Sequence, residues 1–168
     1  ADTRSYSLAS EPDDTSSYTL GILREEAGGG GSAFMHDSVS VGDELQASAP
    51  KNHFPLDDEA EDNLLIAGGI GVTPILAMAR TLAAAEKPYA FHYAAKTPEE
   101  MAFRGDVEGV CGEHAKLYFD GGDPAKGIDL KDLLSHRPPG RHLYVCGPGG
   151  LIEAVRSTAK DAGWPENT

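Results

Sequence analysis

The sequence predicts two structural parts in series: part of a β barrel or sheet over residues 1–58, then a doubly wound α/β domain over 59–168. Three observations support this division. Short β-rich or alternating stretches fill the first part, which is typical of antiparallel strands. In the second part, short apolar runs alternate with helical patterns, which is typical of a parallel sheet with helices on both faces. Between them, the acidic run DDEAED is typical of a solvated connector.

In the first part, three strands are expected over 4–10 (RSYSLAS), 17–25 (SYTLGILRE) and 43–50 (DELQASAP). Turn-forming residues separate them, including the run AGGGGSA over 27–33. Composition alone favours a flexible tether for this run. A loop whose backbone comes close to a ligand is the alternative, because glycine permits close approach.

In the second part, strands and helices are expected to alternate. The four strands are expected over 63–69, 89–96, 115–120 and 142–147. The four helices are expected over 73–86, 98–110, 129–136 and 150–163. Pro74 suits the first turn of its helix, where a missing N–H costs nothing.

Composition excludes several classes of protein. The 168 residues carry 14 Lys and Arg against 27 Asp and Glu, a net charge of −13 that disfavours binding to nucleic acid. No apolar run approaches the ~20 residues of a membrane span, and we expect a cytoplasmic protein. The two cysteines, Cys111 and Cys146, are expected to be thiols and cannot build a zinc or iron–sulfur site alone. No metal site and no hydrolase triad are expected.

The strongest motif is AGGIGVTPIL over 67–76, where a strand ends in glycines and a helix begins. Glycines let the backbone approach a ligand, and the helix N-terminus offers free N–H groups. The motif is not the dinucleotide fingerprint, because Pro74 stands at its third glycine position and no acidic residue follows ~20 positions on. A tight turn without a ligand is the alternative.

A second motif is YVCGPGGLIEAV over 144–155, in which another strand ends in a glycine–proline turn before a helix. Ligands of such sheets bind outside the carboxyl ends of the strands, and this turn lies on the same edge as the first. Cys146 would then lie at the rim, whereas a small buried residue is the alternative.

A third motif is RSYS over 4–7. On a strand its arginine and tyrosine share one face, while the two serines share the other. A guanidinium can pair with a phosphate and a tyrosine can lie against an aromatic ring. An ordinary solvent-facing strand explains the pattern equally well.

Together, the three motifs resemble those of the ferredoxin–NADP⁺-reductase-like flavoproteins. Two longer stretches, 28–56 and 118–134, resemble the FMN-dependent reductase components of Rieske oxygenases, of the phthalate dioxygenase and vanillate demethylase type. The resemblance covers essentially the whole chain. It implies a Greek-key flavin-binding barrel whose first strands are missing, followed by an NAD(H)-binding domain.

The resemblance also implies an activity. A hydride passes from NAD(P)H to bound FMN, and single electrons then pass to a [2Fe–2S] centre that feeds an aromatic-ring oxygenase or demethylase. The iron–sulfur centre is expected in a missing domain or a separate ferredoxin, and the terminal oxygenase is the further partner. NADH is expected over NADPH, and FMN over FAD. The alternatives are an FAD-dependent ferredoxin or flavin reductase, and a non-catalytic electron-transfer or nucleotide-binding subunit.

Each role implied by the resemblance falls on residues of the matching motifs. The flavin residues are Arg4, Ser5, Tyr6, Ser7, Gly30, Gly31 and Ser32, with Arg4 and the glycine turn at the phosphate. The nicotinamide residues are Gly69, Gly71, Thr73, Cys146, Gly147 and Pro148, and those at the adenosine end are Lys96, Arg104 and Asp120, with Phe119 beside them. The residues nearest the reacting rings are Thr73, Cys146 and Ser7. One departure is Gly29, where the family often has arginine.

Overall fold

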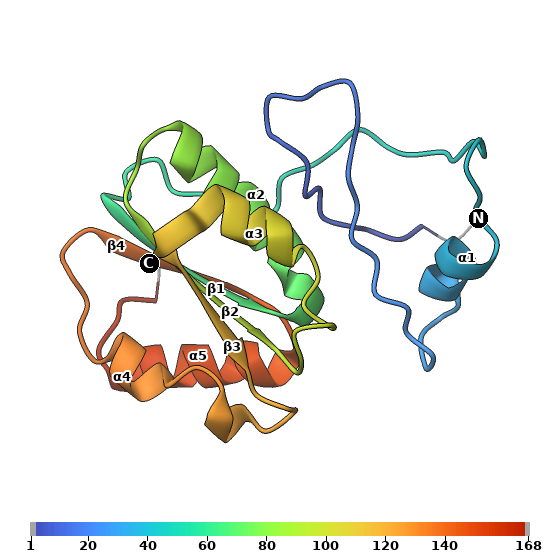
Figure 1. Cartoon of the computed structure of the whole chain (residues 1–168). Coiled ribbons are helices and arrows are strands. Elements are labelled where there is room, and N and C mark those ends of the chain that lie inside the picture. The colour runs from blue at the N-terminus through green and yellow to red at the C-terminus, as the bar shows by residue number, and fades with distance from the viewer. Residues whose placement is uncertain (1–2, 167–168) are drawn as a thin grey trace.

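Four parallel strands form the centre of the structure, a computed structural model that describes residues 3–166. The strands are β1 (Asp62–Gly68), β2 (Tyr89–Ala95), β3 (Ala115–Phe119) and β4 (Arg141–Cys146), in the spatial order β3-β2-β1-β4. Helices α2 (Val72–Ala84) and α3 (Arg104–Cys111) cover one face, and α4 (Leu130–Leu134) and α5 (Gly149–Asp161) cover the other (Figure 1). The predicted doubly wound sheet is confirmed.

The central strand β1 separates two hydrophobic cores. Leu65 and Ala67 pack into the core that contains the α2 side chains. Leu64 and Ile66, which alternate with them, pack into the core that contains residues of α4 and α5. A strand places successive side chains on opposite faces, so burial on both faces explains its continuous apolar run.

Helix α2 follows the sequence pattern closely. It starts after the short 3-10 turn η1 (Gly69–Gly71), and its buried side chains include Ile75, Leu76, Ala79 and Leu82. Their spacing places them on one face of a 3.6-residue helix. Two further 3-10 turns within residues 3–166 are η2 (Gly112–His114) and η3 (Pro124–Lys126).

The helix expected over 98–110 is shorter than predicted. Only α3 forms, from Arg104, because Phe103 before it has the left-handed φ of 56°. A left-handed residue interrupts a right-handed helix, so residues 98–103 are turns and bends.

The three strands expected over 4–10, 17–25 and 43–50 are not formed as strands, and this detail of the prediction is wrong. One antiparallel bridge, Leu8 to Leu20, remains of the pairing between the first two, supported by a 2.9 Å hydrogen bond from Ala9 N to Thr19 O. Alternation defines a buried and an exposed face, but a strand also needs a neighbour to complete its ladder. We call residues 3–61 the N-terminal part; Figure 1 shows it as mostly irregular chain beside α2.

A short helix begins within the glycine run. It is α1 (Gly31–Asp37), and Gly30 before it has the left-handed φ of 82°. The end of the N-terminal part is held to β4, since Asp57 N donates to Tyr144 Oη over 2.9 Å. Across residues 3–166, no helix combines the length and the apolar character needed to cross a membrane.

His92 on β2 has a strongly lowered pKa. Its Nδ1 lies 2.8 Å from Tyr118 Oη, and the two rings stack with centroids 5.8 Å apart. Burial, followed by the positive charges of Lys116 and Arg141, lowers the pKa of His92 to about 4.

This pKa makes the fold sensitive to acid. The unfolded chain takes up the proton at about pH 6.5 and the folded chain only near pH 4, so the free energy of unfolding falls as pH drops through this window. We expect His92→Gln to remove part of that fall. Urea unfolding between about pH 7 and pH 4 measures it, and His53→Gln, at an exposed site, is the control. An unchanged pH profile in His92→Gln would contradict the assignment.

Candidate functional site

The turns after β1 and β4 are in direct contact at the carboxyl edge of the sheet. The two strands pair in parallel up to Ala67 and Cys146. A Cβ added at Gly71 would lie 2.4 Å from the carbonyl carbon and oxygen of Cys146, and one added at Gly147 would lie 3.0 Å from Gly68. The distance at Gly71 is too short for any side chain, so packing between the turns requires glycine there, and the distance at Gly147 is tighter than most Cβ contacts.

The outer side of the same turns is open. A Cβ added at Gly69, Gly149 or Gly150 would have no heavy atom within 4 Å. Neither α2 nor α5 has a side-chain hydrogen bond at its N-cap. Two helix N-termini therefore direct their positive dipole ends to one edge, an arrangement that suits an anionic ligand, although Val72 N of α2 already donates to the Gly69 and Ile70 carbonyls.

Tyr93 supports the first turn and was not predicted from the sequence. Its ring is fully buried, and its hydroxyl donates to the carbonyls of Gly69 and Ala102, each over 3.0 Å. Burial raises the pKa of Tyr93 to about 12, so the hydroxyl remains a donor at neutral pH. Its place in a buried strand was the available signal, because a buried tyrosine hydroxyl normally finds a partner.

The three residues predicted nearest the reacting rings differ in their burial. Thr73 is buried, and its Oγ1 donates to Ile70 O over 3.1 Å. Cys146 is half-buried, and burial raises the pKa of its thiol, which therefore stays neutral. Ser7 is exposed on irregular chain. The structure joins the segments of Thr73 and Cys146 through the two turns.

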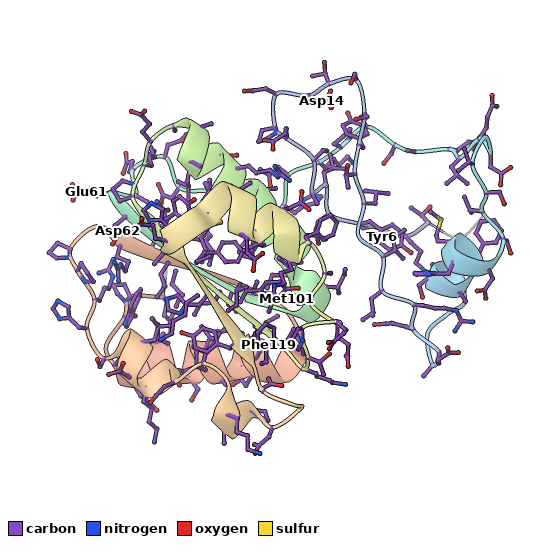
Figure 2. The ribbon with its side chains drawn as sticks, viewed as in Figure 1. Tyr6, Asp14, Glu61, Asp62, Met101 and Phe119 are labelled. Atoms are coloured by element: carbon purple, nitrogen blue, oxygen red, sulfur yellow. The ribbon has the colours of Figure 1, made fainter. Side chains whose placement is uncertain are left out.

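Arg4 lies along the glycine run. Its Nη2 donates to Gly29 O over 3.3 Å, and a Cβ added at Gly31 would lie 2.9 Å from its Cγ. The sequence-predicted pairing of the RSYS motif with this run is therefore present in space. Of the motif's other members, Tyr6 is half-buried and Ser5 is exposed; Figure 2 shows Tyr6 within the N-terminal part.

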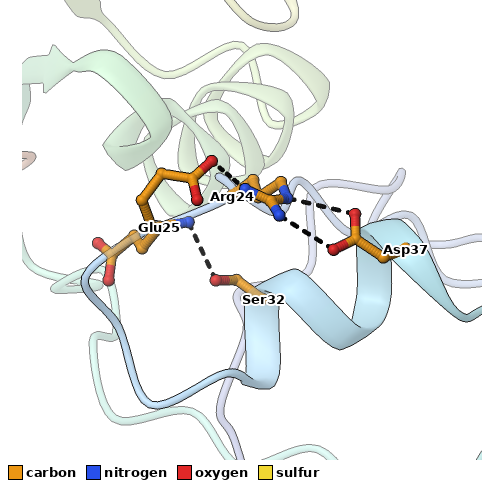
Figure 3. A network of polar contacts seen from close by, with 5 residues as sticks. Arg24, Glu25, Ser32 and Asp37 are labelled. Atoms are coloured by element: carbon orange, nitrogen blue, oxygen red, sulfur yellow. Dashed lines mark hydrogen bonds and ion pairs between the residues drawn. The ribbon is translucent and has the colours of Figure 1, made fainter.

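A polar network holds the loop between Arg24 and α1 (Figure 3). Ser32 Oγ accepts a hydrogen bond from Glu25 N over 3.1 Å. Arg24 donates to both carboxylate oxygens of Asp37, over 3.3 and 3.0 Å, and this hydrogen bonding lowers the pKa of Asp37. The glycine run is thus closed into a loop at both ends and is not a free tether.

The residues predicted at the adenosine end lie after β2, at the end of β3 and at the start of α3. The Arg104 guanidinium lies 5.8 Å from the centroid of the Phe119 ring, and its Nε donates to Glu108 over 2.9 Å. Lys96 is exposed, and its carbonyl accepts from Gly121 N over 2.9 Å. Asp120 accepts from Gly122 N over 2.7 Å.

Phe119 is 40% exposed although it is aromatic, and Figure 2 shows it at the end of β3. Pro148, the last of the predicted residues, is exposed at the N-cap of α5.

We expect the contact between the turns to be visible in stability. Gly71→Ala forces a Cβ against the Cys146 carbonyl and should cost about 1–3 kcal/mol of unfolding free energy, the usual range for overpacking. The matched control Gly149→Ala adds the same methyl group in open space and should leave stability unchanged or slightly higher. Thermal melts followed by circular dichroism compare them. Equal melting temperatures would contradict the packing requirement.

Comparison with known proteins identifies the family. Residues 44–168 match the family described as dimethylamine monooxygenase subunit DmmA-like, N-terminal domain. The chain is 43% identical over 166 residues to a vanillate O-demethylase oxidoreductase of Pseudomonas sp. (strain HR199 / DSM 7063), covering 98% of this chain and 52% of that protein. It is 36% identical over 167 residues to the phthalate dioxygenase reductase of Burkholderia cepacia, covering 98% and 51%.

A solved structure of phthalate dioxygenase reductase, described as modular for electron transfer from pyridine nucleotides to [2Fe-2S], superposes with a TM-score of 0.90 at 36% identity. The superposition covers 97% of this chain and 51% of that structure, so the chain spans about half the length of the relatives it matches. The resemblance stated from the sequence is confirmed. On the match over 44–168, the chain belongs to the family of DmmA-like N-terminal domains.

Proposed function

We propose that this chain is the flavin- and nicotinamide-binding part of an oxygenase reductase. The observation that carries the proposal is the contact between the β1 and β4 turns, which places two uncapped helix N-termini and three open glycines at one edge of the sheet. Parallel sheets bind their ligands at this edge. The names of the relatives support a reductase in particular, since those proteins are reductases of oxygenase systems.

The proposed flavin is FMN, held by the N-terminal part in a two-domain arrangement of 1–58 and 59–168. The loop fits a phosphate. Arg4 supplies a guanidinium against the glycine run, and Gly30 has free space beside its backbone. Ser32 accepts one hydrogen bond from Glu25 N and still carries its own proton to donate. Ser5, Tyr6, Ser7 and Gly31 would complete the flavin site.

The nicotinamide would meet the flavin at the open side of the two turns. Gly69, Gly71, Gly147 and Pro148 would shape this side with backbone alone. Thr73 would keep the first helical turn in place through its bond to Ile70 O. Cys146 would present a neutral, polarisable thiol to the rings rather than act as a nucleophile, because its pKa is raised.

The adenosine end of the nucleotide would lie on the ends of β2 and β3. There Phe119 offers an exposed ring for stacking, while Lys96 and Arg104 offer positive charge. Asp120 caps its own turn and would help to form the pocket wall. We propose NADH as the nucleotide.

The bound cofactors would supply the redox chemistry: nicotinamide donates a hydride, and flavin releases electrons one at a time. The protein's contribution is to orient two planar rings and to exclude water between them. An iron–sulfur domain or a ferredoxin would receive the electrons and pass them to the terminal oxygenase. The proposed location is the cytoplasm.

One experiment tests the assignment directly. The full chain is purified, and any bound flavin is extracted and identified by mass spectrometry. The rate of ferricyanide reduction is then measured with NADH and with NADPH as the electron donor. FMN in the extract and faster turnover with NADH are expected. A colourless protein without this activity would overturn the proposal.

Arg4 permits a sharper prediction. Arg4→Gln removes the charge beside the glycine run, and we expect FMN affinity to fall about tenfold or more, as for loss of a hydrogen bond to a charged group. Riboflavin has no phosphate, so its weaker affinity should not change. Arg156→Gln, an exposed site on α5, makes the same change in net charge and is the control. Quenching of flavin fluorescence measures all affinities, and an equal loss for FMN and riboflavin would contradict the role.

A further inference from the structure

Arg80 joins three segments that are distant in the sequence. It belongs to α2, and its guanidinium forms one ion pair with Glu11 of the N-terminal part. A second ion pair runs from Nη2 to Asp106 on α3, at 2.8 Å. The Arg80 side chain is only 9% exposed. A single buried cation therefore links the N-terminal part to the helical layer of the α/β part.

The burial of Arg80 makes its carboxylate partners necessary. A guanidinium taken out of water needs carboxylate partners to offset its lost hydration. Its Nε has no hydrogen-bond partner among residues 3–166, so the two Nη groups carry the compensation. Glu11 is 60% exposed and would be hydrated equally well elsewhere. The docked arrangement thus gives the Arg80 guanidinium a second carboxylate besides Asp106.

A second contact lies nearer the start of α2. A Cβ added at Gly21 would lie 2.6 Å from the Phe103 ring and 2.7 Å from the Thr73 methyl group. Thr73 and Arg80 are seven residues apart on one helix, which corresponds to about 10 Å along its axis. Two contacts at this separation fix the direction of the N-terminal part as well as its position.

We propose that Arg80 is a positioning residue for the transfer between nucleotide and flavin. Its ion pair with Glu11 holds the N-terminal part against α2, and the Gly21 contact sets where the first turn of α2 meets it. That the positioned groups are a nucleotide and a flavin rests on the proposed function. Arg80 acts through the seating of the N-terminal part, by its ion pair with Glu11.

Hydrogen exchange of the full chain without added cofactor tests the docking. Glu11→Gln removes the link between the parts, and exchange in peptides covering 8–24 should quicken about threefold to tenfold, as for loss of roughly 1 kcal/mol. Asp106→Asn breaks only the link between α2 and α3 and should leave those peptides unchanged. Lys126→Gln breaks an exposed ion pair elsewhere and is the matched control. Unchanged exchange in Glu11→Gln would overturn the proposal.

Stopped-flow reduction of the FMN-loaded chain at saturating NADH tests the positioning. Glu11→Gln should slow flavin reduction about threefold to tenfold while the dissociation constants of FMN and NADH stay the same. Glu11→Lys, which places like charges together, should slow it further, and Glu11→Asp should restore it.

The exchange experiment and the reduction experiment test separate parts of the proposal. Faster exchange with unchanged reduction would refute the positioning role. A wild-type chain that retains no flavin would refute the proposed function, and the exchange result would still decide whether Arg80 docks the N-terminal part.

Discussion

The close approach of the β1 and β4 turns is the constraint on which the rest of the site depends. Gly71 brings its backbone against the Cys146 carbonyl, and Gly147 meets Gly68 in return. Because neither turn has a side chain at these points, the turns that lead into α2 and α5 can meet at one edge of the sheet. The positive ends of the two helices, which cover opposite faces (Figure 1), then both lie at this edge.

A series of contacts carries this geometry outward to the N-terminal part. Tyr93 ties the first turn to Ala102 through one buried hydroxyl. Phe103 follows in a left-handed conformation, which is uncommon for a bulky residue and persists only where the surroundings hold it. Its ring then packs against Gly21. The rigid sheet therefore determines the seating of a segment that has almost no regular structure of its own.

The sequence predicts the α/β part well because its signals are local. The apolar run of β1 and the spacing of Ile75, Leu76 and Ala79 each follow from burial along one element. The N-terminal part is predicted poorly. Alternation over 4–10 and 17–25 indicates which side chains share a face, but it does not indicate which segments pair as neighbouring strands. Composition alone favoured a tether at the glycine run. Only the resemblance placed Arg4 beside it, 25 residues away in the sequence.

Because the chain is strongly negative, an anionic ligand has to be attracted by groups in direct contact with it. A net charge of −13 repels anions such as nucleotides and flavin phosphates from most of the surface. At physiological ionic strength such repulsion fades over about 8 Å, whereas a hydrogen bond or a helix terminus acts within contact distance. Attraction therefore has to come from a few fixed groups: the backbone N–H groups of two helix ends, and single cations such as Arg4 and Arg104. Each of these cations is oriented by an identified neighbour, Gly29 O for Arg4 and Glu108 for Arg104, so both proposed contacts are held in place by the protein itself.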